Sequence, residues 1–359
     1  MKTLRLVVDP AHLDTAGARE TLERGAWILR AGGLVALPTE TVYGLGANAL
    51  DGAAVERIFA AKQRPAWDPV IVHISDLAML QGLVEEIPEA ARKLMQAFWP
   101  GPLTLLLRRT SAVPDAVTAG RLLVGVRMPA HPVALELIRR AGVPVAAPSA
   151  NTFGHISPTS AEHVLEDLDG RIDAVVDAGP TLHGVESTVL DPGQNPMVIY
   201  RPGAVTSVQI RATAGDVEIF KGGAMLVGEP QAALPSPGVG LRHYAPRARL
   251  VLVDAGLEEM ADRLAELAAG LPGDRVGVML PAEVDPAEVE WRPSGAALFR
   301  WGRWAMPEEL AHSLYAGLRA LDAQGCTVIL CPLPRAVGIG AAIRDRLRKA
   351  ADEGLGARD

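Results

Sequence analysis

The stretch "ALPTETVYGLGANAL", residues 36–50, places a cluster of small polar side chains directly after a predicted strand. The apolar run "GLVAL" (33–37) favours a short buried strand. Three hydroxyl groups and a carboxylate follow within seven residues: Thr39, Glu40, Thr41 and Tyr43. Polar groups gathered at the end of a strand are typical of a binding pocket.

Composition limits the class of protein. The chain has 359 residues and 49% hydrophobic residues, which predicts two domains with sizeable cores. No apolar run reaches membrane-spanning length and the N-terminus lacks a signal peptide's apolar region, so we expect a cytoplasmic protein without a membrane segment. The net charge of −7 argues against a dedicated nucleic-acid-binding protein but leaves room for a local basic patch. Cys326 and Cys331 match neither a metal site nor a disulfide framework.

The first part of the chain mixes helices and strands without strict alternation. Asp51 is a plausible N-cap of a helix at 51–64 whose last turn carries Lys62 and Arg64, while Thr159 and Glu162 have the spacing of a capping box. Further helices are predicted at 15–31 and 132–141, and strands at 69–74, 102–109, 122–129, 143–151 and three later runs. This pattern predicts an α/β fold with a mixed twisted sheet over residues 10–207.

The remainder of the chain divides into a linker and a second domain. The periodic pattern weakens over 208–247, where "ALPSPGVGLRHYAP" is rich in Pro and Gly and predicts an extended linker. Residues 248–359 then alternate predicted strands (249–254, 274–280, 326–332) with predicted helices (256–270, 307–323). Alternation of this kind predicts a smaller, Rossmann-like doubly wound domain.

Several other strands of the first domain also end in hydroxyl-bearing or basic side chains. In an open sheet such ends can converge on a crevice. Lys62, Arg64 and Arg201 suit phosphates, and the fork of Arg127 suits a carboxylate. No nucleophile–base pair accompanies them, which favours adenylyl or phosphoryl transfer, where positioning and charge stabilisation do most of the catalysis. Besides Thr39 and Thr41, the set comprises His73, Arg127, Ser149, Asn151, Ser187, Thr188 and Arg201.

Common catalytic motifs are missing from the sequence. There is no phosphate-binding G-x-x-x-x-G-K-[ST] loop, no Gly-x-Ser-x-Gly elbow and no His-Glu-x-x-His pair. "GLGANA" (44–49) matches the G-x-G-x-x-A pattern, but it is too far from the preceding strand to favour dinucleotide binding. We expect Gly44 and Gly46 instead to let the chain turn tightly behind the polar cluster.

Seven motifs in order identify a resemblance. "PTETVYGLGANA", "KQRPAWDPVIVHI", "WPGPLTLLL", "VGVRMPAHP", "APSANTFGHISPT", "ESTVLD" and "YRPGAV" together resemble the YrdC-like threonylcarbamoyl-AMP synthases over residues 10–207. The linker and tail resemble those of the longer, two-domain form. The resemblance implies a reaction of L-threonine, bicarbonate and ATP that gives threonylcarbamoyl-AMP and pyrophosphate. It also implies partner proteins that carry the product to an adenosine beside the anticodon of tRNA.

The resemblance also implies roles for individual residues. Lys62 and Arg64 would be catalytic, neutralising the phosphates and the charge that develops on pyrophosphate. Tyr244 would reach across ATP, so the linker would act as a lid, and Mg²⁺ would accompany ATP with few protein ligands. L-Threonine would be held by Thr41, His73, Arg127, Ala147 and Ser187; ATP would be held by Arg64, Asp68, Leu123, Ser149, Asn151, Ser157, Arg201 and Tyr244.

Two positions depart from the family pattern. The family usually has glycine where Gln63 stands and asparagine where Asp68 stands. A carboxylate at 68 would repel a phosphate rather than donate to it, so Asp68 is expected to face ribose hydroxyls or Mg²⁺ instead.

Two alternatives remain open. The first-domain fold could present a basic concave surface to RNA, with weak tRNA binding, although the chain has no basic run interleaved with aromatic residues. A related carbamoyl-transfer enzyme would need carbamoyl phosphate and, typically, cysteine motifs beyond the two cysteines present.

Overall fold

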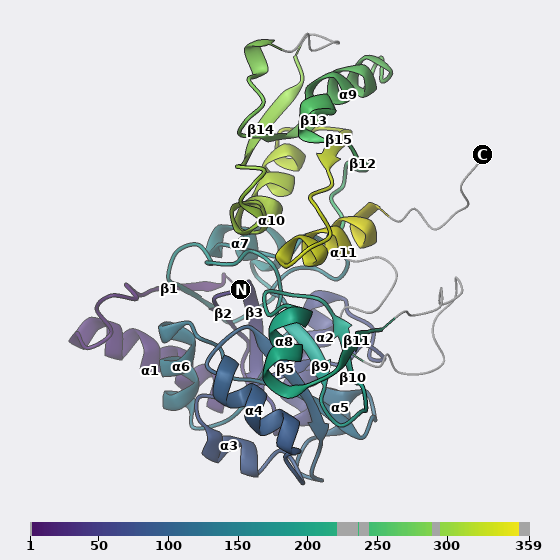
Figure 1. Cartoon of the computed structure of the whole chain (residues 1–359). Coiled ribbons are helices and arrows are strands. Elements are labelled where there is room, and N and C mark those ends of the chain that lie inside the picture. The colour runs from purple at the N-terminus through teal and green to yellow at the C-terminus, as the bar shows by residue number, and fades with distance from the viewer. Residues whose placement is uncertain (1, 221–235, 237–243, 289–294, 352–359) are drawn as a thin grey trace. The chain divides into compact units, whose positions relative to one another are not determined.

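The computed structural model describes residues 2–220, 236, 244–288 and 295–351. It contains two compact units, which are treated separately below (Figure 1). Unit 1 comprises Met1–Phe153 and Ser157–Gly240, and unit 2 comprises Gly154–Ile156 and Leu241–Asp359.

Unit 1 is built on a mixed sheet of eleven strands, which confirms the predicted α/β class. The strand order is β1-β8-β2-β3-β7-β4-β6-β5-β9-β10-β11. Most central neighbours pair antiparallel, while β4 and β6 run parallel. The strands are β1 (Leu4–Val7), β2 (Val35–Pro38), β3 (Tyr43–Asn48), β4 (Ile71–His73), β5 (Leu103–Arg108), β6 (Leu123–Arg127), β7 (Val145–Ala146), β8 (Ala174–Asp177), β9 (Thr188–Asp191), β10 (Met197–Arg201) and β11 (Val217–Ile219).

The sheet of unit 1 is buried on both faces. Along β2, Val35 and Leu37 belong to one apolar cluster, whereas Ala36 belongs to another. Because successive side chains of a strand point to opposite faces, the continuous apolar run of β2 supplies both cores. The run "GLVAL" therefore marks a central strand of the fold.

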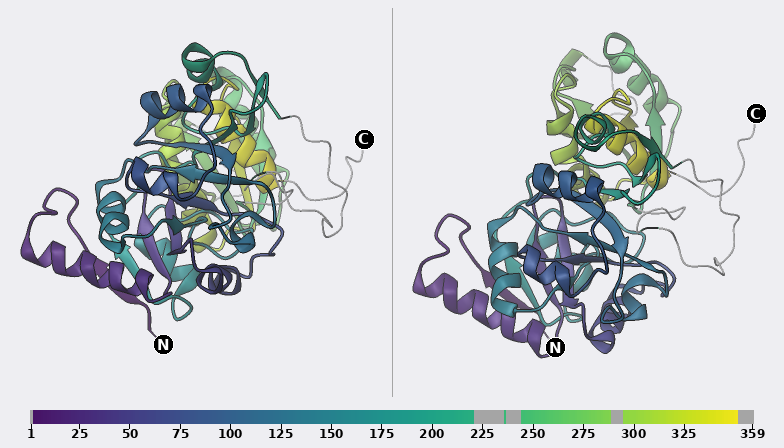
Figure 2. Two further views of the ribbon diagram at one scale, coloured as in Figure 1. Left: turned by 90° about the horizontal axis from the view of Figure 1, so that it is seen from below. Right: turned by 60° about the horizontal axis from the view of Figure 1, so that its bottom comes forward.

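Helices of unit 1 begin largely where the sequence predicts. Thr15 caps α1 by accepting from Ala18 N, and Asp51 caps α2 by accepting from Ala53 N and Ala54 N. Helix α1 packs beside α6 and lies at the rim of the unit in both views of Figure 2. The helices are α1 (Ala16–Arg30), α2 (Gly52–Lys62), α3 (Leu77–Gln81), α4 (Glu89–Phe98), α5 (Asp115–Thr118), α6 (Pro132–Ala141), α7 (Ala161–Leu168) and α8 (Ser207–Ala214).

Two predictions about helix ends are wrong. Helix α2 ends at Lys62, with Gln63 in the left-handed conformation (φ 55°), so Arg64 lies beyond the helix rather than in its last turn. Helix α7 is capped by Ser160, which accepts from His163 N, rather than by Thr159. A positive φ is rare for a residue with a side chain, and glycine would adopt it without strain. This explains why a glycine at position 63 would fit the observed turn.

Gly44 and Gly46 do not form a tight turn but lie inside strand β3. A Cβ on Gly46 would sit 2.8 Å from both Leu37 Cδ2 and Val145 Cγ1. Gly46 is therefore required by close packing between strands, and not by an unusual backbone angle. The placement of "GLGAN" in a strand also removes any reading of it as a cofactor loop.

The predicted linker begins with regular structure. Helix α8 and strand β11 lie within residues 207–219, and β11 adds the last strand to the large sheet. Helix α8 has a complete capping box between Thr206 and Gln209. Most of the remaining linker, including the segment expected to act as a lid, lies outside the described residues.

Unit 2 contains a four-stranded sheet with the order β12-β15-β13-β14, and every described pair in it is parallel. This agrees with the predicted alternation, while the Rossmann-like connection stays a prediction. Helices α10 and α11 pack against each other. The elements are β12 (Arg249–Val253), α9 (Leu257–Ala269), β13 (Val276–Pro281), a 3₁₀ turn (Pro286–Glu288), β14 (Ala297–Gly302), α10 (Pro307–Ala323), β15 (Val328–Pro332) and α11 (Ile339–Ala351).

Both cysteines of the chain, Cys326 and Cys331, are buried free thiols in unit 2. Within the described part of the chain, no helix combines the length and apolar character needed to cross a membrane.

Candidate active site

A buried polar group joins the loop between β2 and β3 to the end of β6. Arg127 Nη1 donates to Thr41 Oγ1 at 2.9 Å, and Arg127 Nε donates to Gly101 O at 3.1 Å. Arg127 Nη2 lies 2.6 Å from Glu40 Oε1 in an ion pair. Thr41 Oγ1 in turn lies 2.8 Å from Thr39 Oγ1. The polar cluster noted in the sequence therefore holds an arginine in place.

The Glu40–Arg127 pair stays ionised despite its burial. Glu40 is 5% exposed and Arg127 is 3% exposed. Burial alone would raise the pKa of the Glu40 carboxyl, but the charge and hydrogen bond of Arg127 outweigh it and hold that pKa below its ordinary value. Breaking such a pair would leave an uncompensated buried charge, which is strongly unfavourable.

His73 and Ala147 lie next to this group. His73 pairs with Arg127 in the register of β4 and β6, and Ala147 N donates to Ile71 O at 2.8 Å. Burial, helped by the charge of Arg127, lowers the pKa of His73 to about 3, so the imidazole is neutral. Its Nδ1 is buried and has no hydrogen-bond partner among the described residues. A neutral imidazole with an unused nitrogen is suited to hydrogen bonding with a small polar ligand.

Lys62 joins α2 to the loop after β7. Its Nζ donates to the backbone oxygens of Ser149, at 2.6 Å, and of Asn151. The side chain is 1% exposed, and burial together with the charge of Arg64 lowers the pKa of Lys62 well below its usual range. The structure thus brings a predicted catalytic residue, Lys62, together with two predicted ATP contacts, Ser149 and Asn151.

Asp68 faces Arg64 in the described structure. Arg64 Nη2 lies 2.9 Å from Asp68 Oδ2, and the guanidinium also donates to the backbone oxygens of Asp68 and Pro69. Burial raises the pKa of Asp68, and the charges of Arg64, Lys62 and Arg201 partly offset this. Because all three cations act on one carboxylate, Lys62, Arg64 and Arg201 share one electropositive region.

Ser187 and Arg201 meet at the junction of β9 and β10. Arg201 Nη2 donates to Ser187 Oγ at 3.0 Å, and Arg201 Nε donates to Ser187 O at 3.1 Å. Ser187 Oγ also lies 2.8 Å from Thr104 Oγ1 of β5. Beside them, Ser157 Oγ donates to Glu186 Oε1 at 2.6 Å. A predicted threonine contact, Ser187, therefore touches a predicted ATP contact, Arg201.

Two further predicted site residues have other surroundings. Leu123 is at the opposite end of β6 from Arg127 and packs beside an apolar cluster formed by Ile71, Leu106 and Val189. Tyr244 belongs to unit 2, where it is buried and its ring stacks on Tyr315 with a centroid separation of 5.8 Å. Their predicted roles in ATP binding stay predictions.

Sequence reasoning gave no role to several residues that complete the site. Glu40 was visible in "PTET", but its partner lies 87 positions later at Arg127. Thr104 and Glu186 also support site hydroxyls. A glycine offered another signal: a Cβ on Gly203 would lie 2.3 Å from Thr188 N and 2.5 Å from Glu186 O. Only a glycine allows the backbone after β10 to pass this close to the Ser187 region.

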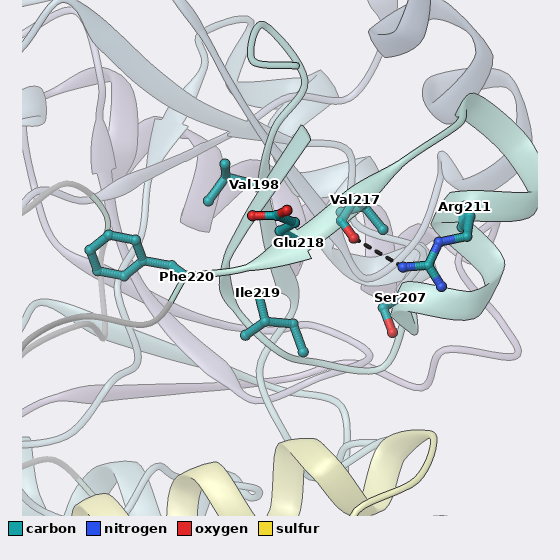
Figure 3. Close-up of a pocket in the computed structure, with 7 residues that line it drawn as sticks. All are labelled: Val198, Ser207, Arg211, Val217, Glu218, Ile219 and Phe220. Carbon is teal, nitrogen blue, oxygen red and sulfur yellow. Dashed lines mark hydrogen bonds between the residues drawn. The ribbon is translucent and has the colours of Figure 1, made fainter. Parts of the chain in front are cut away.

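A separate cavity of about 570 Å³ lies between α8 and the strands β10 and β11 (Figure 3). Its lining includes Arg211, which donates to Val217 O at 3.1 Å, and the side chains of Ile219 and Phe220. None of the predicted site residues lines it. The cavity is therefore distinct from the candidate site.

Metal-ligating side chains do not gather in the described structure. Within the residues described, no group of three His, Cys, Asp or Glu side chains could hold a metal ion.

Comparison with known proteins relates both parts of the chain to one family. A family model described as "Telomere recombination" (Sua5_yciO_yrdC) matches residues 27–203. A second, described as "Threonylcarbamoyl-AMP synthase, C-terminal domain", matches residues 205–352. The threonylcarbamoyl-AMP synthase of Bacillus subtilis is 44% identical over 353 residues, covering 98% of each chain. That of Pyrococcus abyssi is 44% identical over 327 residues, covering 90% of this chain and 92% of the relative.

Solved structures relate the chain to the same family. P. abyssi Sua5 in complex with L-threonine superposes with a TM-score of 0.86 at 40% identity, covering 98% of both chains. A doubly substituted variant of the same protein gives a TM-score of 0.87 and covers 97% of this chain and 96% of that one. The fold, the clustered site residues and these comparisons together show that the chain belongs to the two-domain threonylcarbamoyl-AMP synthase family.

Proposed function

We propose that this chain joins L-threonine, bicarbonate and ATP into L-threonylcarbamoyl-AMP with release of pyrophosphate. The observation that carries the proposal is the pairing of two sites within unit 1. Arg127, Thr41 and His73 form a buried polar group, and Arg64 pairs with Asp68, on whose carboxyl the charges of Lys62 and Arg201 also act. The Ser187–Arg201 hydrogen bond connects a predicted threonine contact to those cations.

In this proposal the first group binds L-threonine. Arg127 offers its guanidinium to the carboxylate, while Thr41 and the neutral His73 orient the polar groups of the substrate. Ser187 and the backbone near Ala147 complete the contacts. Buried, preorganised hydrogen-bonding groups of this kind reject analogues that lack a matching polar group.

The second group binds ATP and stabilises the charge of the reaction. The amine of threonine takes up CO₂ from bicarbonate to give a carbamate, and a carbamate oxygen attacks the α-phosphorus of ATP. The bond between the α- and β-phosphates breaks, and its electron pair leaves with pyrophosphate. Lys62, Arg64 and Arg201 stabilise the negative charge on the phosphates as this charge develops on the leaving group. Ser149, Asn151 and Ser157 position the nucleotide.

Mg²⁺ accompanies ATP in this proposal and supplies further charge neutralisation on the phosphates. The Asp68 carboxylate pairs with Arg64. The product is consumed in the cytoplasm by partner proteins that transfer the threonylcarbamoyl group to an adenosine beside the anticodon of tRNA.

The test is pyrophosphate release from ATP and bicarbonate, with and without L-threonine. Release that depends on L-threonine supports the synthase, whereas release that ignores threonine points to an ATP pyrophosphatase and overturns the threonine site. L-Serine provides a matched control substrate because it lacks only the methyl group of threonine.

A further inference from the structure

Thr39 and Thr41 form a buried pair of hydroxyl groups in the loop between β2 and β3. Their oxygens lie 2.8 Å apart, and the distance alone allows either of them to be the donor. Thr39 is 2% exposed and Thr41 is 1% exposed, so neither hydroxyl turns to bulk water. The direction of the hydrogen bond between them therefore depends on the other partners of the two oxygens.

Thr39 has no hydrogen to offer to Thr41, because a hydroxyl group has only one hydrogen to donate. Thr39 Oγ1 lies 2.6 Å from Val42 O, and a carbonyl oxygen can only accept, so the Thr39 hydrogen lies in this contact. The same hydroxyl oxygen accepts from the backbone N–H groups of Thr41 and Val42, each at 3.2 Å. Thr41 is therefore the donor in the 2.8 Å contact between the two hydroxyl groups.

Thr41 keeps one acceptor position for a ligand and no donor. Its hydrogen points to Thr39, and its oxygen accepts from Arg127 Nη1 at 2.9 Å. A hydroxyl oxygen accepts two hydrogen bonds, so one lone pair remains. That lone pair can take an N–H or O–H group of a ligand, whereas a carboxylate oxygen placed there would have no hydrogen between it and Thr41 Oγ1.

Arg127 has the complementary capacity, because a guanidinium carries five N–H hydrogens and no acceptor. Thr41 and Gly101 O accept two of these hydrogens, and the ion pair with Glu40 uses a third. The remaining two can only donate, which suits a carboxylate. An α-amino acid has its amine on the carbon that bears the carboxylate. A carboxylate bound at Arg127 therefore brings the amine, rather than a more distant donor, close to Thr41.

We propose that Thr41 accepts a hydrogen bond from the amine of L-threonine, and that Thr39 is the positioning residue that fixes Thr41 in this role. The inference rests on the proposed function, in which Arg127 binds the carboxylate. Thr39 does not touch the ligand. It accepts the hydrogen of Thr41, so that only a lone pair of Thr41 faces the substrate. The site thus selects for a donor next to the carboxylate and orients the nitrogen that takes up CO₂.

The experiment measures dissociation constants of the full-length chain by calorimetry for three ligands: L-threonine, L-2-aminobutyrate, which lacks the hydroxyl, and (R)-3-hydroxybutyrate, which lacks the amine. Thr39→Val removes the acceptor of the Thr41 hydrogen, whereas none of the Arg127 contacts described above involves Thr39. The Thr41 hydrogen can then turn toward the ligand, where it opposes the amine. We expect the constants for both amines to rise about tenfold, and that for (R)-3-hydroxybutyrate to stay within about twofold.

Two variants serve as controls. Thr39→Ser keeps the hydroxyl and should match the original chain with all three ligands. Thr3→Val removes another buried threonine hydroxyl of unit 1. Thr3 Oγ1 donates to Ile172 O at 3.1 Å and accepts from Gly170 N at 3.0 Å, and neither partner belongs to the candidate site. Thr3→Val should therefore leave all three dissociation constants unchanged, even where it lowers the melting temperature.

Thr41→Val gives an independent test, because it removes the acceptor itself. It should weaken binding of the two amines about tenfold and change binding of (R)-3-hydroxybutyrate little. A loss confined to the two ligands that carry a hydroxyl would mean that Thr41 pairs with the substrate hydroxyl. An equal loss for all three ligands, in either valine variant, would mean that the pair acts only through the carboxylate or through stability. Each of these results overturns the inference.

The binding test separates the inference from the proposed function. An original chain that binds no L-threonine would overturn both. An original chain that binds L-threonine, with dissociation constants that Thr39→Val leaves unchanged, would overturn the inference alone. The predicted result is a loss of affinity that follows the amine across the three ligands.

Discussion

Arg127 Nη2 lies 2.6 Å from Glu40 Oε1 in the interior of unit 1, and the same guanidinium donates to Thr41. The carboxylate balances the buried charge, and the threonine hydroxyl fixes the plane of the fork. The guanidinium is therefore oriented before any ligand arrives. Such preorganisation reduces the entropy lost on binding.

Arg127→Lys should raise the KM for L-threonine by about 10- to 100-fold and change the KM for ATP little. Lysine keeps the charge but loses the planar fork that matches a carboxylate. Steady-state pyrophosphate release at varied threonine checks this. The control is Arg108→Lys, because Arg108, the last residue of β5, forms an exposed pair with Glu85 in the loop between α3 and α4. Equal increases in both KM values would contradict a specific role for Arg127 in threonine binding.

His73→Asn should reduce the loss of stability of unit 1 that accompanies a fall in pH. The pKa of His73 is about 3 in the folded protein and about 6.5 when unfolded. As pH falls below 6.5, the unfolded chain binds a proton that the folded chain refuses, so stability falls by about 1.4 kcal/mol per pH unit until pH approaches 3. The variant has no imidazole at position 73 and therefore lacks this pH-dependent change in the free energy of unfolding. Native-state hydrogen exchange at β4 and β6, measured at pH 7 and pH 5, should show a smaller loss in the variant by about 2 kcal/mol.

The control for that measurement is His12→Asn, since His12 is exposed and paired with Asp9. Its exchange profile at β4 and β6 should match that of the original chain at both pH values. If His73→Asn showed the same pH dependence as the original chain, the imidazole would not be buried in its neutral form.

Lys62→Met should strongly reduce activity without a matching loss of stability. Burial lowers the pKa of Lys62, so near neutral pH the folded state disfavours the charge that the unfolded chain carries freely. Methionine removes this cost but also removes the donor to the backbone oxygens of Ser149 and Asn151, so the free energy of unfolding of unit 1 should change by less than about 2 kcal/mol. Activity should fall by about 100-fold or more because a preorganised cation near the phosphates is lost. Full activity with lower stability would assign Lys62 a structural role alone.

Asp68→Asn should lower the KM for ATP by about three- to tenfold. The change removes a buried negative charge beside Lys62, Arg64 and Arg201, and an amide can donate to a phosphate whereas a carboxylate repels it. Asp173→Asn is the control for the loss of a carboxylate, because Asp173 forms a more exposed 3.0 Å pair with Arg57 outside the site. A higher KM for ATP in Asp68→Asn would mean that the carboxylate orients Arg64 productively.

Much of the fold follows from local sequence signals. Helix α6 begins at Pro132 and ends before Gly142, and α10 also begins at a proline; both ranges match the prediction. Strand β3 could not be predicted, because "GLGAN" has low strand propensity. Its pairing depends on space left between Leu37 and Val145, which are distant in sequence.

The types of residue in the site could be predicted from the sequence, but the contacts between them could not. Residues suited to phosphates and a carboxylate could be selected from their chemistry and motif order. That Lys62 donates to the carbonyl of Ser149, or that Asp68 pairs with Arg64, depends on backbone positions fixed by the folded chain. Glu40 is the clearest example of a partner that could not be predicted, because nothing in the sequence around "PTET" indicates that this carboxylate pairs with Arg127 on β6.

The most direct test of the central claim is the mass of the nucleotide product formed from ATP, L-threonine and ¹³C-labelled bicarbonate. The account predicts an adenylate with the mass of threonylcarbamoyl-AMP, heavier by one carbon isotope than the product from unlabelled bicarbonate. A product of plain AMP, or an adenylate without the labelled carbon, would contradict the assignment of threonylcarbamoyl-AMP synthesis to this chain.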